Sequence, residues 1–131
     1  MSEIETPPVG TIVWYDLTVV EAEKVRDFYR QVVGWGAEAL DMGGYSDFSM
    51  LPPGAERPVA GVCHARGGNA DLPPQWLAYV VVEDLDASLS ACQELGGKVL
   101  TPTKSMEGAR YAVIQDPAGA VLALYQPPTA A

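Results

Sequence analysis

The sequence contains one pattern twice, and this internal repeat limits the possible folds more than any other feature. At an offset of 63 residues, the matched positions are Leu17 with Val80, Val19 with Val82, Glu21 with Asp84, Val32 with Leu95, and Gly34 with Gly97. At an offset of 62 residues, Pro58-Val59 matches Ala120-Val121. The repeat predicts two similar modules joined in one chain.

The first copy begins with residues 11–19, a run rich in β-branched and aromatic residues that predicts a strand. In residues 21–33 apolar residues recur every three to four positions, which predicts an amphipathic helix, and Gly34 is suited to end it. Turn residues then separate three short strand candidates at 38–42, 45–51 and 58–65. The order is β-α-β-β-β.

The second copy has the same order, after a polar connection at residues 66–75. A strand is expected at 76–82, and Asp84 is expected to cap a helix with an apolar face of Leu85, Leu89, Cys92 and Leu95. The last strands are expected at 98–103, 110–115 and 120–125. We therefore expect an α+β fold in which two βαβββ modules form a curved mixed sheet around a cleft. The expected single domain is 9–127, with modules at about 10–66 and 75–127 and flexible tails at 1–8 and 128–131.

Composition limits the classes of function. The chain has 131 residues, 48% hydrophobic and 19% charged, which excludes intrinsic disorder. Its net charge of −9 disfavours nucleic acids and anionic membranes and favours cationic or neutral small ligands. Two cysteines are too few for a disulfide scaffold, and we expect both as thiols, with a single disulfide as the alternative. Residues 1–8 lack the pattern of a signal peptide, and no apolar run reaches the roughly 18 residues of a membrane span. We expect a cytoplasmic protein.

Three segments carry a family resemblance. They read VWYDLTVVEAEKVRDFYRQVVGW, WLAYVVVEDLDASLSACQELGG and RYAVIQDPAGAVLALYQP. They include Phe28-Tyr29 before Gly34, the run Asp84-Leu85-Asp86-Ala87, and Asp116-Pro117-x-Gly119. Together they resemble the glyoxalase/bleomycin-resistance/extradiol-dioxygenase superfamily, which has the vicinal oxygen chelate fold. The resemblance runs from Gly10 to Pro127 and implies the same βαβββ modules.

The resemblance also implies where a metal ion would bind. Metal-dependent members carry His, Glu or Gln at one position of each key strand. The matching positions here are Trp14, Leu77, Gly61 and Ala123, whose side chains carry no metal ligand. The chain has one histidine, His64, so it cannot supply two-His-one-carboxylate ligands by itself. We expect no metal and no cofactor. His64 is expected at a surface or strand edge, opposite in face to Gly61, with ligand contact as the alternative.

Alternation along the strands then indicates which side chains face the cleft. If Trp14 faces it, so do Asp16 on the same strand, Leu77 and Tyr79 on the second, and Ala123 and Tyr125 on the last. Tyr15, Leu17 and Val19 would pack against a helix. This cleft is apolar and aromatic, as small-molecule sites usually are, with Asp16 as an isolated carboxylate. Such a carboxylate needs a partner, for which Arg110 and a cationic ligand are the two candidates.

Two functions follow from this site. The first is a metal-free binding protein for a small hydrophobic or cationic molecule, assembled as a homodimer and binding neither nucleic acid nor membrane. The second is a lyase or isomerase of the same superfamily that uses a cleft carboxylate such as Asp16 as general base. Enolate chemistry usually needs a metal or oxyanion donors. The missing ligand set therefore favours binding, and no catalytic residue is assigned.

Overall fold

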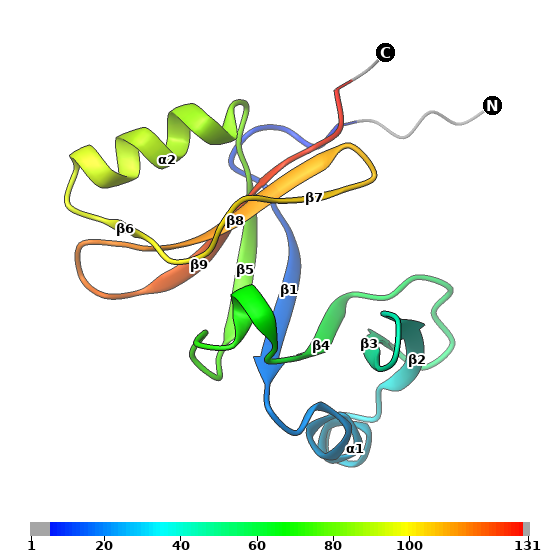
Figure 1. Cartoon of the computed structure of the whole chain (residues 1–131). Coiled ribbons are helices and arrows are strands. Elements are labelled where there is room, and N and C mark those ends of the chain that lie inside the picture. The colour runs from blue at the N-terminus through cyan, green and yellow to red at the C-terminus, as the bar shows by residue number, and fades with distance from the viewer. Residues whose placement is uncertain (1–5, 130–131) are drawn as a thin grey trace. The chain divides into compact units, whose positions relative to one another are not determined.

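The computed structural model describes residues 6–129 and is shown in Figure 1. In chain order its elements are β1 (Ile12–Val19), α1 (Ala22–Val32), β2 (Gly36–Asp41), β3 (Ser46–Leu51), β4 (Ala60–His64), a 3-10 turn (Gly67–Asn69), β5 (Trp76–Val81), α2 (Leu85–Glu94), β6 (Lys98–Val99), β7 (Lys104–Met106), β8 (Ala109–Gln115) and β9 (Val121–Gln126). Parallel and antiparallel pairs occur together, so the sheet is mixed. The predicted α+β class is confirmed, and the second module has one strand, β7, more than predicted.

The chain divides into two compact units. The first unit comprises residues 14–77 and holds most of β1, α1 and β2 to β4. The second unit comprises the described residues before 14 and from 78 onward, including α2 and β6 to β9. Both boundaries fall inside strands, β1 and β5.

In the first unit the strand order is β2-β3-β4-β1. Strand β1 pairs with β4 in parallel, with Asp16 opposite Gly61 and Leu17 opposite Val62. Helix α1 covers one face, where Ala22 packs with Phe48, Met50 and Val62, and Val19 joins this cluster. Leu17 and Val19 therefore face α1, while Trp14, Asp16 and Thr18 lie on the other face. The alternation predicted for this strand is confirmed.

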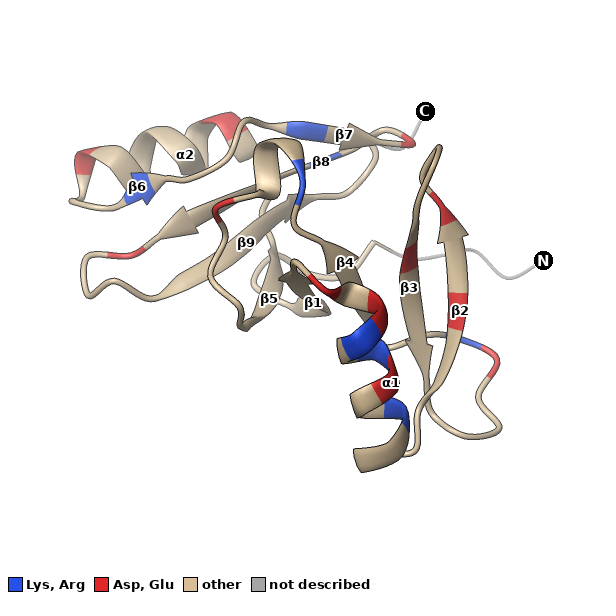
Figure 2. Ribbon diagram, turned by 60° about the horizontal axis from the view of Figure 1, so that its bottom comes forward, with Lys and Arg blue, Asp and Glu red and all other residues tan. Residues whose placement is uncertain are grey.

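Helix α1 ends as its sequence predicts. Its last residue is Val32, and Gly34 follows with φ +89°, the left-handed conformation that glycine adopts without strain. Charged residues lie along the helix (Figure 2), with Glu23 in the first turn and Arg30 in the last. These signs match the helix dipole.

In the second unit the strand order is β5-β9-β8-β6, and β7 also pairs with β8. Strands β5 and β9 are parallel, with Tyr79 opposite Ala123. This pair is the repeat equivalent of Asp16 and Gly61, at the offsets of 63 and 62 residues found in the sequence. The repeat therefore extends to the register of the central strand pair in each unit.

Helix α2 is fixed at its start by two side chains. Asp84 Oδ1 accepts a hydrogen bond from the Ala87 N–H at 3.1 Å, which confirms the predicted cap. Gln126 Oε1, from β9, accepts one from the Leu85 N–H at 2.7 Å. The helix is therefore capped by its own first turn and held to the sheet.

The strand predicted at 98–103 is much shorter in the structure and spans Lys98–Val99. Pro102, which has no N–H to donate to a sheet, lies in the part of the predicted strand that is not formed. Thr101 Oγ1 instead accepts a hydrogen bond from the Val113 N–H at 3.0 Å. Strand β7 follows and joins β8 through Glu107 and Gly108, at φ 51° and 88°. Two left-handed residues make the tight turn of a two-residue hairpin.

Three further expectations concern the tails of the chain, its cysteines and membrane-spanning helices. Of the predicted tails, residues 1–5 and 130–131 lie outside the described residues, and 6–8 and 127–129 form neither helix nor strand. Between residues 6 and 129 no disulfide links the two cysteines. Neither helix of this part of the chain is long and apolar enough to cross a membrane.

Candidate functional site

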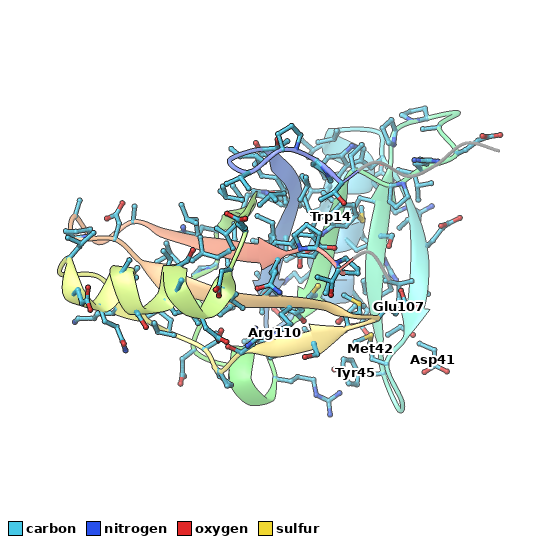
Figure 3. The ribbon with its side chains drawn as sticks, turned by 90° about the horizontal axis from the view of Figure 1, so that it is seen from above. Trp14, Asp41, Met42, Tyr45, Glu107 and Arg110 are labelled. Atoms are coloured by element: carbon cyan, nitrogen blue, oxygen red, sulfur yellow. The ribbon has the colours of Figure 1, made fainter. Side chains whose placement is uncertain are left out.

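Trp14 and Asp16 form the centre of the candidate site in the first unit. They lie two residues apart on β1 and so share the face that points away from α1. The Trp14 Nε1–H donates a hydrogen bond to Asp16 Oδ1 at 2.6 Å, and both side chains are half-buried. Trp14 is labelled in Figure 3. The carboxylate thus has a partner that the sequence did not indicate, the indole of its neighbour.

Gly61 lies directly beneath this pair. It is the register partner of Asp16 on β4 and is buried. A Cβ atom added to Gly61 would overlap Asp16 Oδ1 and would lie 3.5 Å from Trp14 Nε1. The space where a side chain at position 61 would project is therefore filled by the Asp16 carboxylate.

These contacts test the metal site that the resemblance implies. The Trp14 indole N–H is a donor without a lone pair for a metal, and Gly61, Leu77 and Ala123 have no ligand atoms in their side chains. Leu77 and Ala123 are moreover buried, at 1% and 0% exposure. Within residues 6–129 no three His, Cys, Asp or Glu side chains gather into a possible metal site. The residues at the implied positions do not fit a metal ion.

The second unit presents an aromatic face. Tyr79 lies opposite Ala123 across β5 and β9, and Tyr111 lies opposite Tyr125 across β8 and β9. The rings of Tyr79 and Tyr111 are 5.9 Å apart. Three predicted residues, Tyr79, Ala123 and Tyr125, thus share one face of this sheet. Tyr111 joins them, and only the pairing of β8 with β9 could have identified it.

Arg110 is on β8 and is labelled in Figure 3. It precedes Tyr111, so by alternation it points to the other face of the same sheet. It pairs with Gln126, whose side chain caps α2. Its Nη2 donates to Asp86 Oδ1 at 2.9 Å, and its Nη1 donates to Asp86 Oδ2 at 3.3 Å. The guanidinium holds the pKa of Asp86 below its usual range, and Asp86 raises the pKa of Arg110. Because Arg110 is bound to helix α2, we leave it out of the ligand-binding set proposed below.

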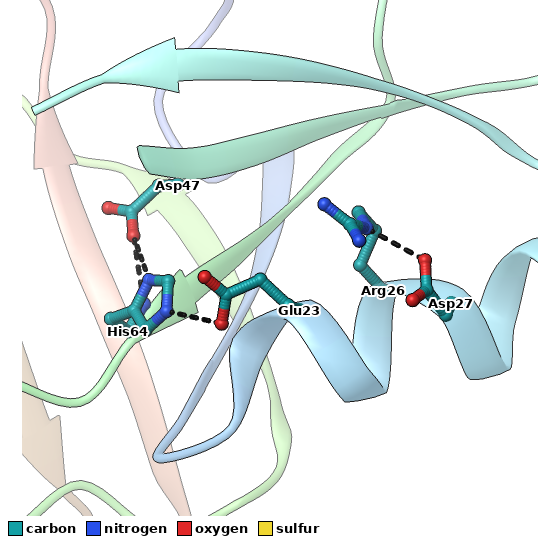
Figure 4. Close-up of polar contacts among 5 residues, drawn as sticks. All are labelled: Glu23, Arg26, Asp27, Asp47 and His64. Carbon is teal, nitrogen blue, oxygen red and sulfur yellow. Dashed lines mark hydrogen bonds and ion pairs between the residues drawn. The ribbon is translucent and has the colours of Figure 1, made fainter. Parts of the chain in front are cut away.

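His64 ties α1 to the sheet of the first unit (Figure 4). Its Nε2 lies 3.1 Å from Glu23 Oε1 on α1, and its Nδ1 lies 3.3 Å from Asp47 Oδ1 on β3. Asp47 Oδ1 also accepts the His64 backbone N–H at 2.9 Å. The hydrogen bond from His64 holds the pKa of Glu23 below its usual range. His64 therefore lies on the α1 side, opposite to Gly61 as predicted, and its contact with a ligand stays a prediction.

An apolar pocket lies elsewhere in the first unit. It has a volume of about 420 Å³ and is lined by Tyr15, Trp35, Val59, Ala60 and Trp76. The sequence does not indicate this pocket: the strand pattern predicts that Tyr15 packs against a helix, and no motif marks Trp35 or Trp76 as a binding residue. These side chains come together only through the pairing of strands and the end of α1.

With this geometry known, comparison with known proteins identifies the family. The family model described as Glyoxalase/Bleomycin resistance protein/Dioxygenase superfamily matches residues 11–124. The chain belongs to this superfamily. The match runs from β1 into β9 and confirms the resemblance seen in the sequence.

Two curated proteins are similar in sequence to this chain. CFP32 of Mycobacterium bovis is 31% identical over 119 residues, which cover 89% of this chain and 46% of CFP32. The anthracycline biosynthesis protein DnrV of Streptomyces peucetius is 30% identical over 129 residues, covering 89% of this chain and 47% of DnrV. The chain therefore spans about half the length of these curated relatives.

Solved structures share the fold at low sequence identity. The hypothetical protein BH1468 of Bacillus halodurans has a TM-score of 0.60 at 12% identity, over 93% of this chain and 97% of that chain. Methylmalonyl-CoA epimerase of Mycobacterium tuberculosis has a TM-score of 0.54 at 16% identity, over 97% and 94%. At these identities the likeness concerns the fold alone.

Proposed function

We propose that this chain is a metal-free binding protein of the superfamily that holds a small hydrophobic or cationic molecule. The observation that carries the proposal is the Trp14–Asp16 hydrogen bond above Gly61. At two positions implied to hold a metal in related enzymes, this chain has an indole and a glycine covered by a carboxylate. Such a surface offers a ring face and a negative charge, which suit binding better than Lewis-acid chemistry.

The chemistry of these groups favours an aromatic or cationic ligand. An indole face attracts a cation by about 0.5–2 kcal/mol. A carboxylate accepts hydrogen bonds and carries a negative charge, so the ammonium group of a ligand is a chemically suitable partner for Asp16. The net charge of −9 supports the same sign of ligand by raising the local concentration of cations. On the second unit, Tyr79, Tyr111 and Tyr125 add aromatic surface of the same kind.

The names of relatives support a small organic ligand. DnrV is named for anthracycline biosynthesis, and the superfamily name includes bleomycin resistance. We extend to this chain only the class of ligand that these names share, a small organic molecule. The proposal also includes a homodimer, because β2 ends the strand order of its unit and carries Leu40 at 48% exposure. The cytoplasmic location expected from the sequence is kept as part of the proposal. Light scattering at tens of micromolar tests the dimer against the 13.9 kDa chain.

A pair of matched probes tests the proposed site. 1-Naphthylmethylamine, protonated at pH 7, and the neutral 1-naphthalenemethanol have the same ring system and differ in charge. Calorimetry should show that Asp16→Asn weakens the amine about tenfold and the alcohol much less, because a hydrogen bond to a charged group is lost. The amide oxygen that this substitution introduces can still accept the Trp14 N–H, so the fold is kept. Trp14→Ala should weaken both probes.

Other outcomes would contradict the proposal. Equal losses for amine and alcohol in Asp16→Asn would give Asp16 a purely structural role and remove the cationic ligand. Unchanged binding of both probes in Trp14→Ala would place the site elsewhere. Catalytic turnover of a small substrate that Asp16→Asn abolishes would favour the lyase or isomerase instead. Circular dichroism and thermal melting of each variant show whether it is folded.

A further inference from the structure

The apolar pocket of the first unit is a second place where a small molecule fits. Its five lining residues, Tyr15, Trp35, Val59, Ala60 and Trp76, all belong to residues 14–77. Its volume of about 420 Å³ lies within the range of roughly 300–1,000 Å³ typical of ligand pockets. The lining surface is almost entirely apolar. The pocket is therefore large enough for one or two fused rings.

The pocket lies on the opposite side of the strands from the proposed functional site. Tyr15 and Ala60 are register partners on β1 and β4. By alternation they share the α1-facing side with Leu17 and Val62, while Trp14 and Asp16 point the other way. A ligand in this pocket would not touch Trp14 or Asp16, so the inference does not rest on the proposed function.

The aromatic walls are held in place before any ligand binds. Trp76 Nε1 donates a hydrogen bond to the Tyr29 hydroxyl on α1 at 3.1 Å. The Trp35 and Trp76 rings meet edge to face at 5.7 Å, and Tyr29 contacts both, at 5.9 Å and 5.3 Å. All three rings also pack against the core of Phe48, Met50 and Val62. A preformed wall reduces the entropy lost on binding.

These contacts define the chemistry of the ligand. The Trp76 N–H is already satisfied by Tyr29, so this indole offers its ring and not its donor. None of the lining residues carries a charged side chain. Burying a charge or an unpaired polar group in such a place would be costly, whereas aromatic rings pack favourably edge to face or offset. We infer that this pocket binds a neutral, planar aromatic molecule.

The three tryptophans of the chain make a direct test possible, because Trp35 and Trp76 line the pocket and Trp14 lies on the other face. In ¹H–¹⁵N spectra of the full chain, each indole N–H gives its own signal, assigned with single Trp→Phe variants. Titration with 1-naphthalenemethanol should shift the Trp35 and Trp76 signals in a saturable way. A second, separate shift of Trp14 would report the proposed functional site.

A blocking variant and a matched control complete the experiment. Val59 lies at the rim of the pocket at 44% exposure, and Val20 lies outside it at 79%. Val59→Arg should weaken the probe at least about tenfold at Trp35 and Trp76, because a charged chain enters an apolar rim. Val20→Arg makes the same change elsewhere and should have less than about a twofold effect.

Three results would overturn the inference. One is the absence of Trp35 and Trp76 shifts at millimolar probe, and another is equal binding by Val59→Arg and the parent chain. The third is probe binding that appears only as the protein is diluted and a dimer dissociates, which would show that a second copy covers the pocket. If the probe shifts the Trp35 and Trp76 signals but not the Trp14 signal, the result would count against the proposed function and not against this inference.

Discussion

Asp16 lies over Gly61, its register partner on the neighbouring parallel strand, so closely that a methyl group on Gly61 would overlap the carboxylate. The Trp14 indole holds the carboxylate there by a hydrogen bond of 2.6 Å. The identity of Gly61 is thus explained by a side chain on another strand, since no left-handed backbone conformation is involved at this position.

The first prediction concerns this contact. Gly61→Ala should lower the free energy of unfolding by about 1–3 kcal/mol, the usual cost of adding a methyl group to a packed site. In an Asp16→Ala background the same substitution should be close to neutral, because the overlapping oxygen is gone. Urea unfolding of the four chains gives the coupling free energy between the two positions.

Gly36→Ala is the matched control for this cycle. Gly36 is also in a strand of the first unit, yet a Cβ there meets only the Leu51 carbonyl oxygen at an ordinary 3.8 Å. It should change stability by less than about 0.5 kcal/mol. If Gly61→Ala costs the same with and without the Asp16 carboxylate, the contact does not explain the glycine.

Much of the fold follows from the sequence because its signals are local. The helix at Ala22–Val32 shows the apolar period of an amphipathic helix, and Asp84 has the side chain of a helix cap. The sequence does not predict strand β7, because Glu107-Gly108 lacks the Asn or Asp that usually marks a two-residue turn. Glutamate is not a typical turn residue, so the residue type of Glu107 does not indicate that it lies in a turn.

The candidate site was only partly predictable for a similar reason. Alternation along one strand is enough to put Trp14 and Asp16 on the same face. The closeness of Asp16 to Gly61 depends on the register of β1 with β4, which tertiary packing determines. The Asp86 partner of Arg110 required the packing of α2 against β8. To predict the pocket lined by Trp35 and Trp76, both the register of the strands and the packing of a helix on the sheet must be known.

The second prediction concerns the strained turn between β7 and β8. Glu107 has φ 51°, a left-handed conformation that costs an ordinary residue roughly 1–2 kcal/mol. Asparagine adopts it more readily, so Glu107→Asn should raise the free energy of unfolding by about 0.5–1 kcal/mol. Glu107→Gln removes the same charge without relieving the backbone and should give no such gain. Equal gains in both variants would show that charge, and not conformation, is responsible.

The third prediction concerns acid stability. The Arg110 guanidinium lowers the pKa of Asp86 in the folded chain, whereas in the unfolded chain the pKa is near the ordinary value of about 3.9. At a pH between these two pKa values, unfolding of the chain therefore takes up a proton at Asp86. The stabilising contribution of the pair is present above about pH 5 and is lost as the pH falls through the folded pKa.

Asp86→Asn should accordingly flatten the fall in stability between about pH 5 and pH 2, as measured by urea unfolding at each pH. The effect should be small and should shrink in 1 M salt, because the Asp86 side chain is 71% exposed. Glu23 and Asp27, whose pKa values are also lowered by their partners, should preserve part of the slope. Glu94→Gln, at the other end of α2, is the charge-matched control. A slope that Asp86→Asn leaves unchanged and Glu94→Gln flattens would contradict the assignment of this acid sensitivity to the Asp86–Arg110 pair.

The last prediction concerns metal. The side chains at the implied positions in the first unit are Trp14, Gly61 and Leu77, and none can donate a lone pair to a divalent ion, while Asp16 is a single carboxylate bonded to an indole. A protein site needs three or four such ligands in a defined shell to hold zinc, nickel or manganese. Chain expressed with supplemented metal and then dialysed should therefore contain well under one metal ion per chain by elemental analysis. Its melting temperature should be unchanged by a chelator, because a bound ion would stabilise the folded state in proportion to its affinity. One ion per chain that Asp16→Asn removes, together with a lower melting temperature in chelator, would show that the carboxylate over Gly61 is a metal ligand.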